Sequence, residues 1–412
     1  MSASNSDRPV KLVLDQPDYG FDRPLDRSRL STWKWEGDIA RKGDPDLLCL
    51  GIAEMDFPAA PPIVHAMQRL IDTGHFGYPY KQQPYYDALV GYLARRFDWQ
   101  VEQSWIAHNV GIYPSMHALI EQLSEPGDEI IFQSPVHHIF PEIISAGMRV
   151  PVANPLRETA GRYEMDFEDL AAKIGPRTRM LFLCNPHNPV GRAWSCAELS
   201  RLNEICVARG VIVVSDEVYA SLVFPGATFT PFAKVSAEAA QNSVTLMSAS
   251  KSFNLTGLKH SIVIAPNPHL LDRYMRGMRS TNLYFGGSIF GQAATEAAFR
   301  HCDTWTDALM AYIGANVDLV RQFIATRMPG VRMSEPEATY FAWLDFRQLG
   351  LEPDALQSFF EDQAHVALTM GEPMGPGGAG FARLNLATRR SIIEQALHRI
   401  ADAYQGLNSR SR

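Results

Sequence analysis

Three apolar runs of the sequence, beginning at residues 180, 211 and 244, each end in polar side chains that could act together. The loops that follow them carry Asn188, Asp216 and Lys251, in that order. Lys251 comes after a Val-Thr-Leu-Met run and has the small hydroxyl side chains of Ser248 and Ser250 beside it. A lysine amine presented in this way is suited to attack a carbonyl carbon, so the first chemistry that the sequence indicates is imine formation.

A parallel sheet is the element that must position these residues. The predicted elements of this region are a helix over Tyr113–Ser124, a strand over Glu129–Phe132, a strand over Met180–Cys184, a helix over Cys196–Arg209, and strands over Val211–Val214, Val244–Met247 and Ser261–Ala265. Near-continuous Val, Ile and Leu runs flanked by helices are typical of parallel strands covered on both faces. Ligands of such sheets bind beyond the carboxyl ends of the strands, so we expect the three polar loops to form one site.

After residue 305 the pattern changes to that of a smaller α+β unit. Its predicted elements are a long amphipathic helix through Arg327, a strand over Ala338–Asp345, a helix near Pro353–Ala364 and a terminal helix after Arg390. The glycine-rich stretch 371–380 is either a flap beside a site or a plain connector. We predict three segments: an N-terminal arm with part of the small domain over residues 1–58, a large domain carrying the site over 59–305, and a C-terminal small domain over 306–412.

The composition narrows the possible partners. The chain has 412 residues, a formal net charge of -7 and no long basic run, which argues against nucleic acid and anionic membrane surfaces and favours a small-molecule substrate. No window approaches about 18 uninterrupted apolar residues, and residues 1–11 lack the apolar centre of a signal peptide, so we expect a cytoplasmic protein. The five cysteines have no metal-ligand spacing; we predict reduced packing residues and no metal site.

The three strand-end residues are together the parts needed to hold pyridoxal 5'-phosphate. Lys251 would form an imine with its aldehyde, Asp216 would keep the ring nitrogen protonated, and Asn188 would donate to the phenolic oxygen. Protonation makes the ring an electron sink. Each residue alone has an ordinary alternative: Lys251 could be a surface lysine, and Asp216 could cap a helix starting at Glu217.

The cofactor's phosphate also needs donors. Gly111 stands just before the predicted helix, so the backbone amides of Ile112 and Tyr113 would meet a dianion at the helix N-terminus. If Lys251 forms the imine, the nearby polar side chains Ser248, Ser250 and Lys259 are within reach of the same phosphate. Their alternative role is that of solvated loop residues.

With these residues in place, the chain resembles the fold-type I pyridoxal-phosphate enzymes of the class I/II aminotransferase group over nearly its whole length. The segments that carry the resemblance are Asn185–Gly191, Ser215–Tyr219, Ser248–Lys251 and Phe381–Asn385. The resemblance implies an α/β fold with a mainly parallel seven-stranded sheet sandwiched by helices, and a smaller α+β domain. It also implies Lys251 as the imine lysine, Asp216 as the pyridinium partner, Asn188 and Tyr219 at the phenolic oxygen, and Arg383 at the substrate carboxylate.

Within this group, four further segments resemble the cystathionine β-lyase type of C–S lyase: Lys34–Glu36, Ala53–Phe57, His75–Tyr78 and Thr339–Asp345. That resemblance implies β-elimination from an S-substituted L-cysteine, giving a thiol, pyruvate and ammonia. It places Ala53 and Asn188 beside Arg383 in substrate binding and gives Tyr219 a catalytic role with Lys251. The tyrosine matching Tyr78 reaches the phosphate of the neighbouring subunit, which implies a homodimer with shared sites.

The sequence departs from the group's pattern at three positions. The segment Pro135–Phe140 puts His137 where relatives carry a ring-stacking tyrosine, Lys259 stands for an arginine, and Val190 stands for a threonine. His137 adds a titratable group at the cofactor, where it could be catalytic or could only replace the stacking plane.

Three alternatives to β-elimination remain at this stage. An aminotransferase would use the same lysine to move the proton and needs a keto acid. A specialised enzyme could turn to decarboxylation with deamination, or to γ-elimination. A non-catalytic regulator built on this fold would carry a DNA-reading domain, and the roughly 30 residues before Trp33 are too few for one.

Overall fold

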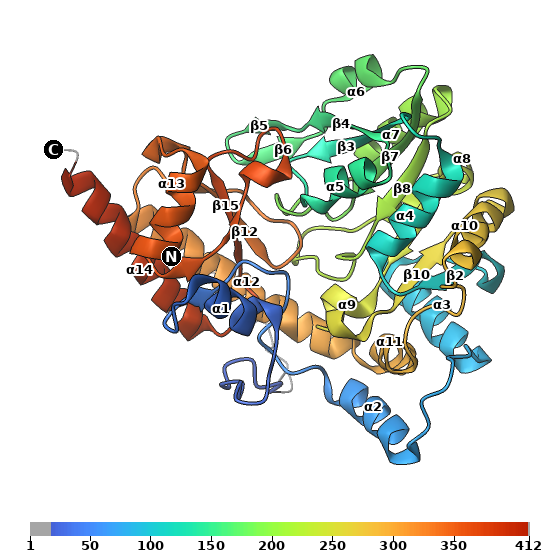
Figure 1. The fold of residues 1–412 in the computed structure, drawn as a ribbon, viewed down its shortest axis with the longest axis horizontal. Helices are drawn as coiled ribbons and strands as arrows, with labels where there is room; N and C mark the ends of the chain where they lie inside the picture. The colour runs from blue at the N-terminus through green and yellow to red at the C-terminus, as the bar shows by residue number, and fades with distance from the viewer. Residues whose placement is uncertain (1–17, 411–412) are drawn as a thin grey trace, which may run out of the picture.

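The computed structural model describes residues 18–410 and is built around a seven-stranded sheet (Figure 1). The strand order is β2 (Ile106–Asn109), β10 (Ser261–Ile264), β9 (Ser243–Met247), β8 (Ile212–Asp216), β7 (Thr178–Cys184), β3 (Glu129–Ser134) and β4 (Val150–Pro155). Strand β10 is antiparallel to both neighbours, and the pairs from β9 to β4 are parallel. The predicted α/β class is confirmed. The prediction made for residues 1–11 lies outside the described residues.

Helices cover both faces of this sheet because its strands bury both sets of alternating side chains. Ile130 and Phe132 lie in one apolar cluster, and Ile131 between them lies in another. The first cluster packs under α4 (Ile112–Leu123), α5 (Ile139–Ala146) and α10 (Pro268–Ser280), and the second under α6 (Phe167–Lys173), α7 (Cys196–Ala208) and α8 (Ala237–Gln241). The bounds predicted for the helix 113–124 and for the strands of this sheet lie within two residues of the observed bounds.

A four-stranded antiparallel sheet forms the smaller unit, at the orange and red end of the chain in Figure 1. Its order is β11 (Arg332–Met333), β12 (Phe341–Asp345), β15 (Phe381–Asn385) and β14 (Thr369–Met370), with α12 (Asp303–Arg327), α13 (Pro353–Ser358) and α14 (Arg390–Arg410) around it. The strand predicted from Ala338 begins only at Phe341, because Thr339 has a left-handed backbone (φ 72°) that interrupts extended structure. The helix predicted to Ala364 ends in a π-turn over Phe359–Gln363.

The described N-terminal segment pairs with the smaller unit. Strand β1 (Leu48–Cys49) pairs in parallel with β13 (Val366–Ala367), and the Asn385 amide donates to the Leu50 carbonyl at 2.8 Å. The other elements used below are α1 (Asp38–Lys42), α2 (Pro61–Thr73), α3 (Gln83–Phe97), α9 (Ala249–Ser252) and α11 (Ile289–His301). Within the described range 18–410, no helix has the length and apolar character needed to cross a bilayer.

Candidate active site

The structure brings the three strand-end residues to one edge of the large sheet. Asn188 follows β7, Asp216 is the last residue of β8, and Lys251 lies in α9 directly after β9. Cys184 at the end of β7 is in register with Asp216, so the strands end side by side. The Asp216 charge also acts on the pKa of Lys251, which places the carboxylate and the amine in one electrostatic environment.

Lys251 is held as a weakly basic amine. Its Nζ donates to the backbone carbonyl of Ala53 at 2.8 Å. Burial, followed by the nearby charge of Arg383, lowers the pKa of Lys251 to about 8. The amine is therefore closer to its neutral, nucleophilic form than an exposed lysine at the same pH.

Asp216 is a buried carboxylate with no cation in contact among residues 18–410. Its side chain is 6% exposed and accepts a hydrogen bond from the Val218 amide at 3.2 Å. Burial raises the pKa of Asp216 to about 7. Residues from 217 onward form turns and no helix starts there, so the alternative of Asp216 as a helix cap is wrong. A cationic N–H placed against this carboxylate would relieve the cost of its burial.

Arg383 enters the site from the smaller sheet. Its guanidinium donates to Asn188 Oδ1 at 2.8 Å, to the Gly51 carbonyl at 2.9 Å and to Thr369 Oγ1 at 3.2 Å. It lies 4.1 Å from the ring centroid of Phe341 and is 1% exposed. The Nε atom is buried without a hydrogen-bond partner among the described residues. The Arg383 guanidinium is thus held in place by the protein, and its Nε–H can still donate to an anion.

Tyr219 is a protonated phenol near Arg383. It is 3% exposed, and its ring centroid is 5.7 Å from that of Tyr340. Burial, followed by the neighbouring Tyr340, raises the pKa of Tyr219 well above its ordinary value. The phenol can therefore donate a hydrogen bond to an oxyanion but not act as a tyrosinate.

His137 follows the end of β3, and Tyr113 is in the first turn of α4. Tyr113 Oη is 3.3 Å from His137 Nδ1, and the two rings are near-parallel with centroids 6.0 Å apart. Burial, followed by the charge of Arg383, lowers the pKa of His137 well below its ordinary value. The glycine-rich stretch 371–380 is a connector from β14 to β15 that packs beside this group, because the Met374 carbonyl accepts from the Val136 amide at 3.1 Å.

The residues predicted to bind the phosphate lie at the N-terminus of α4 and in the segment from Ser248 to Lys259. Ile112 is the first residue of α4, after an extended Gly111, so the helix N-terminus is where the sequence predicted it. The Ser248 hydroxyl donates to the His260 carbonyl at 2.7 Å and accepts from the Ser250 amide at 3.1 Å, so its one proton is already used within the protein. Lys259 is exposed, with φ 52°.

Tyr78 does not reach this site within one chain. It is 82% exposed and stacks on Phe285 at a centroid distance of 4.7 Å. Lys81 donates to the carbonyls of Phe285 and Gly286 and so fixes the segment against which Tyr78 stacks.

Several residues that shape the site were not among the predicted site residues. Gly51 and Thr369 hold the Arg383 guanidinium, and Thr369 is its register neighbour across β14 and β15. Asn385 donates to the carbonyls of Ile52 and Glu54, each at 2.7 Å, and so holds the segment whose Ala53 carbonyl receives Lys251. Asn385 lies two residues after Arg383 on the same strand, and this period-two spacing is the one signal that could have indicated it.

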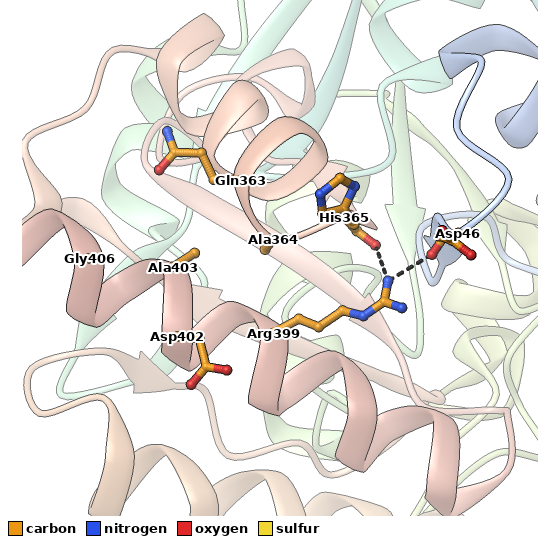
Figure 2. Close-up of a pocket in the computed structure, with 8 residues that line it drawn as sticks. All are labelled: Asp46, Gln363, Ala364, His365, Arg399, Asp402, Ala403 and Gly406. Atoms are coloured by element: carbon orange, nitrogen blue, oxygen red, sulfur yellow. Dashed lines mark hydrogen bonds between the residues drawn. The ribbon is translucent and has the colours of Figure 1, made fainter.

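A hollow of about 910 Å³ elsewhere on the molecule carries no comparable chemistry. It lies between α14 and the segment around His365, and Figure 2 shows Arg399 at its edge. The Arg399 guanidinium donates to the backbone carbonyls of Asp46 and His365, at 2.7 and 3.1 Å. Its charge is thus used in joining α14 to the N-terminal segment. In the part of the chain that the structure describes, no cluster of His, Cys, Asp or Glu could hold a metal ion.

Comparison with known proteins identifies relatives that match most of this chain. The model of the family described as aminotransferase class I and II matches residues 45–400. Cystathionine beta-lyase PatB of Bacillus subtilis is 37% identical over 388 residues, which are 93% of this chain and 99% of that protein. The arginine–pyruvate transaminase AruH of Pseudomonas aeruginosa is 30% identical over 359 residues, 86% of this chain and 89% of that one. The crystal structure of cystalysin from Treponema denticola, which contains a pyridoxal 5'-phosphate cofactor, superposes with a TM-score of 0.92 at 28% identity, covering 94% of this chain and 99% of that chain.

Proposed function

The chain belongs to the aminotransferase class I and II family, and from this premise we propose that it is a pyridoxal-phosphate-dependent C–S lyase. Its substrate is an S-substituted L-cysteine: β-elimination releases a thiol, and water hydrolyses the remaining aminoacrylate to pyruvate and ammonia. The observation that carries the proposal is the weakly basic Lys251 amine beside the buried carboxylate of Asp216 and the Arg383 fork, in a chain whose relative PatB is a cystathionine beta-lyase.

The residues of the site fit pyridoxal phosphate. The buried Asp216 carboxylate lacks a cationic partner among the described residues and would receive the pyridinium N–H. Asn188 and Tyr219 would donate to the phenolic oxygen, and the amides of Ile112 and Tyr113 would hold the phosphate at the N-terminus of α4. Lys251 would hold the aldehyde carbon covalently. Ser248, Ser250 and Lys259 stay proposed phosphate contacts, of which the Ser248 hydroxyl would have to exchange its bond to His260.

When bound, pyridoxal phosphate supplies a cationic ring that accepts the electron pair left on the substrate's α-carbon. Arg383 binds the α-carboxylate, for which its buried Nε and guanidinium plane offer a bidentate contact. Asn188 and Ala53 line the same position. The Lys251 amine would take the α-proton, a role suited to its pKa of about 8. The thiolate then departs with the electron pair of its C–S bond.

An aminotransferase is the second candidate, and the identity to the transaminase AruH favours it. The same Lys251 would return the proton to a different carbon, and no leaving group would depart. The two reactions differ in their products, because transamination needs a keto acid and converts the cofactor to its amine form.

We also propose a homodimer in which Tyr78 serves the neighbouring site. Its 82% exposure, its stacking on Phe285 and the exposed Phe76 and Tyr80 nearby mark an aromatic surface that a second copy would cover. We further propose domain boundaries at residues 58 and 305. We also propose a cytoplasmic location, because the buried free thiols of Cys49, Cys184, Cys206 and Cys302 agree with a reducing compartment.

Product analysis with L-cystathionine tests the function. The wild-type enzyme should release pyruvate without an added keto acid, and Lys251→Ala should release none. Formation of the amine form of the cofactor and of the keto acid that corresponds to cystathionine, with no pyruvate, would support the aminotransferase and reject the lyase. Lys42→Ala, at a half-buried lysine of α1 that pairs with Asp362, is a control that should leave the rate unchanged.

A further inference from the structure

Two side chains at the site form a contact that neither the resemblance nor the mechanism above explains. Tyr113 comes from the first turn of α4, and His137 comes from the loop between β3 and α5. Their Oη and Nδ1 atoms are 3.3 Å apart. The Phe140 amide donates to the His137 carbonyl at 3.0 Å, and the His138 ring stacks on His137 at 4.5 Å, so the imidazole is held from its backbone and from one face.

We propose that Tyr113 and His137 form a hydrogen-bonded pair that presents the Nε2–H of a neutral imidazole to the sulfur leaving group of the substrate. The proposal rests on the proposed lyase function. Tyr113 is the positioning residue, because it acts through His137, and His137 is the catalytic residue.

The direction of the hydrogen bond follows from the surroundings of the two rings. Burial, followed by the charge of Asp216, raises the pKa of Tyr113 far above its ordinary value, so its oxygen keeps its proton. Burial and the cations Arg383 and Lys251, with His138, keep His137 neutral. The phenol O–H is then the donor and Nδ1 the acceptor, which leaves the ring proton on Nε2.

The free edge of His137 faces outward from this pair. Within the described residues Nε2 has no hydrogen-bond partner, and it is not among the buried polar atoms that lack one, so it can meet a ligand. His137 also lies close enough to Arg383 and Lys251 for both charges to act on it. These are the residues that would bind the substrate's carboxylate and take its α-proton, so the β-substituent lies within the same small volume.

A neutral imidazole donor stabilises charge on a departing atom without giving up its proton. In the step proposed here the Cβ–S bond breaks, its electron pair stays on sulfur, and the Nε2–H hydrogen-bonds that sulfur as charge develops. The thiolate takes its proton from water after release. The benefit is greatest for basic alkanethiolates and least for acidic arenethiolates or chloride, which leave unaided.

Substrates that differ only in the leaving group test this role in the holoenzyme. For His137→Phe, which keeps a ring plane but no donor, kcat/KM for S-methyl-L-cysteine should fall roughly 10-fold to 100-fold, the worth of one hydrogen bond to a charged group. For S-(4-nitrophenyl)-L-cysteine and 3-chloro-L-alanine the fall should be less than about threefold. His137→Gln, whose amide nitrogen matches Nε2, should restore the S-methyl-L-cysteine rate, and His269→Gln, at an exposed histidine of α10, is the matched control.

The ring proton can be located independently of activity. Histidine labelled with ¹⁵N in the ring, assigned by its loss in His137→Gln, should show a protonated Nε2 and a bare Nδ1 between pH 6 and 8, and Tyr113→Phe should give a mixture of tautomers. A proton on Nδ1, or an equal loss of rate with all three substrates in His137→Phe, would overturn the pair. Absence of pyruvate from all three substrates in the wild-type enzyme would instead overturn the lyase function, and the leaving-group role with it.

Discussion

Asp216→Asn should stabilise the cofactor-free protein while it weakens cofactor binding. The folded pKa of Asp216, about 7, lies above the ordinary value of 3.8, so its stability contribution is fully present below pH 3.8 and is lost as the pH rises towards 7. Three units correspond to about 4 kcal/mol at pH 8. Asparagine keeps the oxygen that accepts from the Val218 amide, and its buried N–H₂ costs about 1 to 3 kcal/mol, so a net gain of about 1 to 3 kcal/mol should remain.

The pH dependence of this gain is the sharper measurement, because the cost of the buried amide does not change with pH. The advantage of Asp216→Asn over the wild-type apoenzyme should grow by roughly 2 to 3 kcal/mol between pH 5 and pH 8. Thermal melting of both apoenzymes across this range, after removal of the cofactor, measures it. Asp128→Asn is the matched control of opposite sign, because the Glu125 amide and Arg179 lower the pKa of Asp128.

Reloading both proteins with pyridoxal phosphate should reverse the order of stability, because the wild-type carboxylate then pairs with a cation and the amide cannot. Two results would refute the assignment of Asp216 as a buried carboxylate that binds a cationic group of the cofactor. One is an Asp216→Asn apoenzyme that is less stable than wild type at pH 8. The other is a stability advantage of Asp216→Asn that shrinks as the pH rises.

Three further predictions concern other parts of the molecule. Arg383→Lys should lower kcat/KM for S-substituted cysteines roughly 100-fold, because a point charge replaces a bidentate fork; an unchanged steady-state rate would place the carboxylate elsewhere. When the Tyr78→Ala and Lys251→Ala proteins are mixed equally and exchange subunits, half of the dimers are mixed, and each mixed dimer has one complete site out of two. About a quarter of wild-type activity should therefore be recovered. No recovery would argue for sites built from single chains. Burial lowers the folded pKa of His108 below 6.5, so its contribution to stability is present above pH 6.5 and is lost as the pH falls. Wild type should therefore lose roughly 1.4 kcal/mol of stability between pH 7.5 and 5.5 that His108→Gln does not lose, as measured by thermal melting. An equal pH dependence in both proteins would contradict a neutral buried imidazole.

Much of the large sheet could be predicted because its signals are local. Apolar runs of strand length flanked by helical periodicity define β7, β8 and β9, and the residues directly after them must meet at one edge when the strands are parallel. The predicted start of the strand at Ala338 was wrong by three residues, because a left-handed residue such as Thr339 leaves no mark in an apolar pattern.

The sequence by itself therefore determined which chemical groups stand at the strand ends, since a residue's place after a buried strand is a property of its neighbours in the chain. Only the tertiary structure decided what those groups can do. Arg383 contacts Asn188 across 195 residues of chain, and Tyr113 meets His137 across the turn from α4 to β3 and the strand itself. The pKa values of Asp216 and Lys251 depend on exclusion of water by side chains from several elements, and no local pattern encodes the solvent that a folded chain removes.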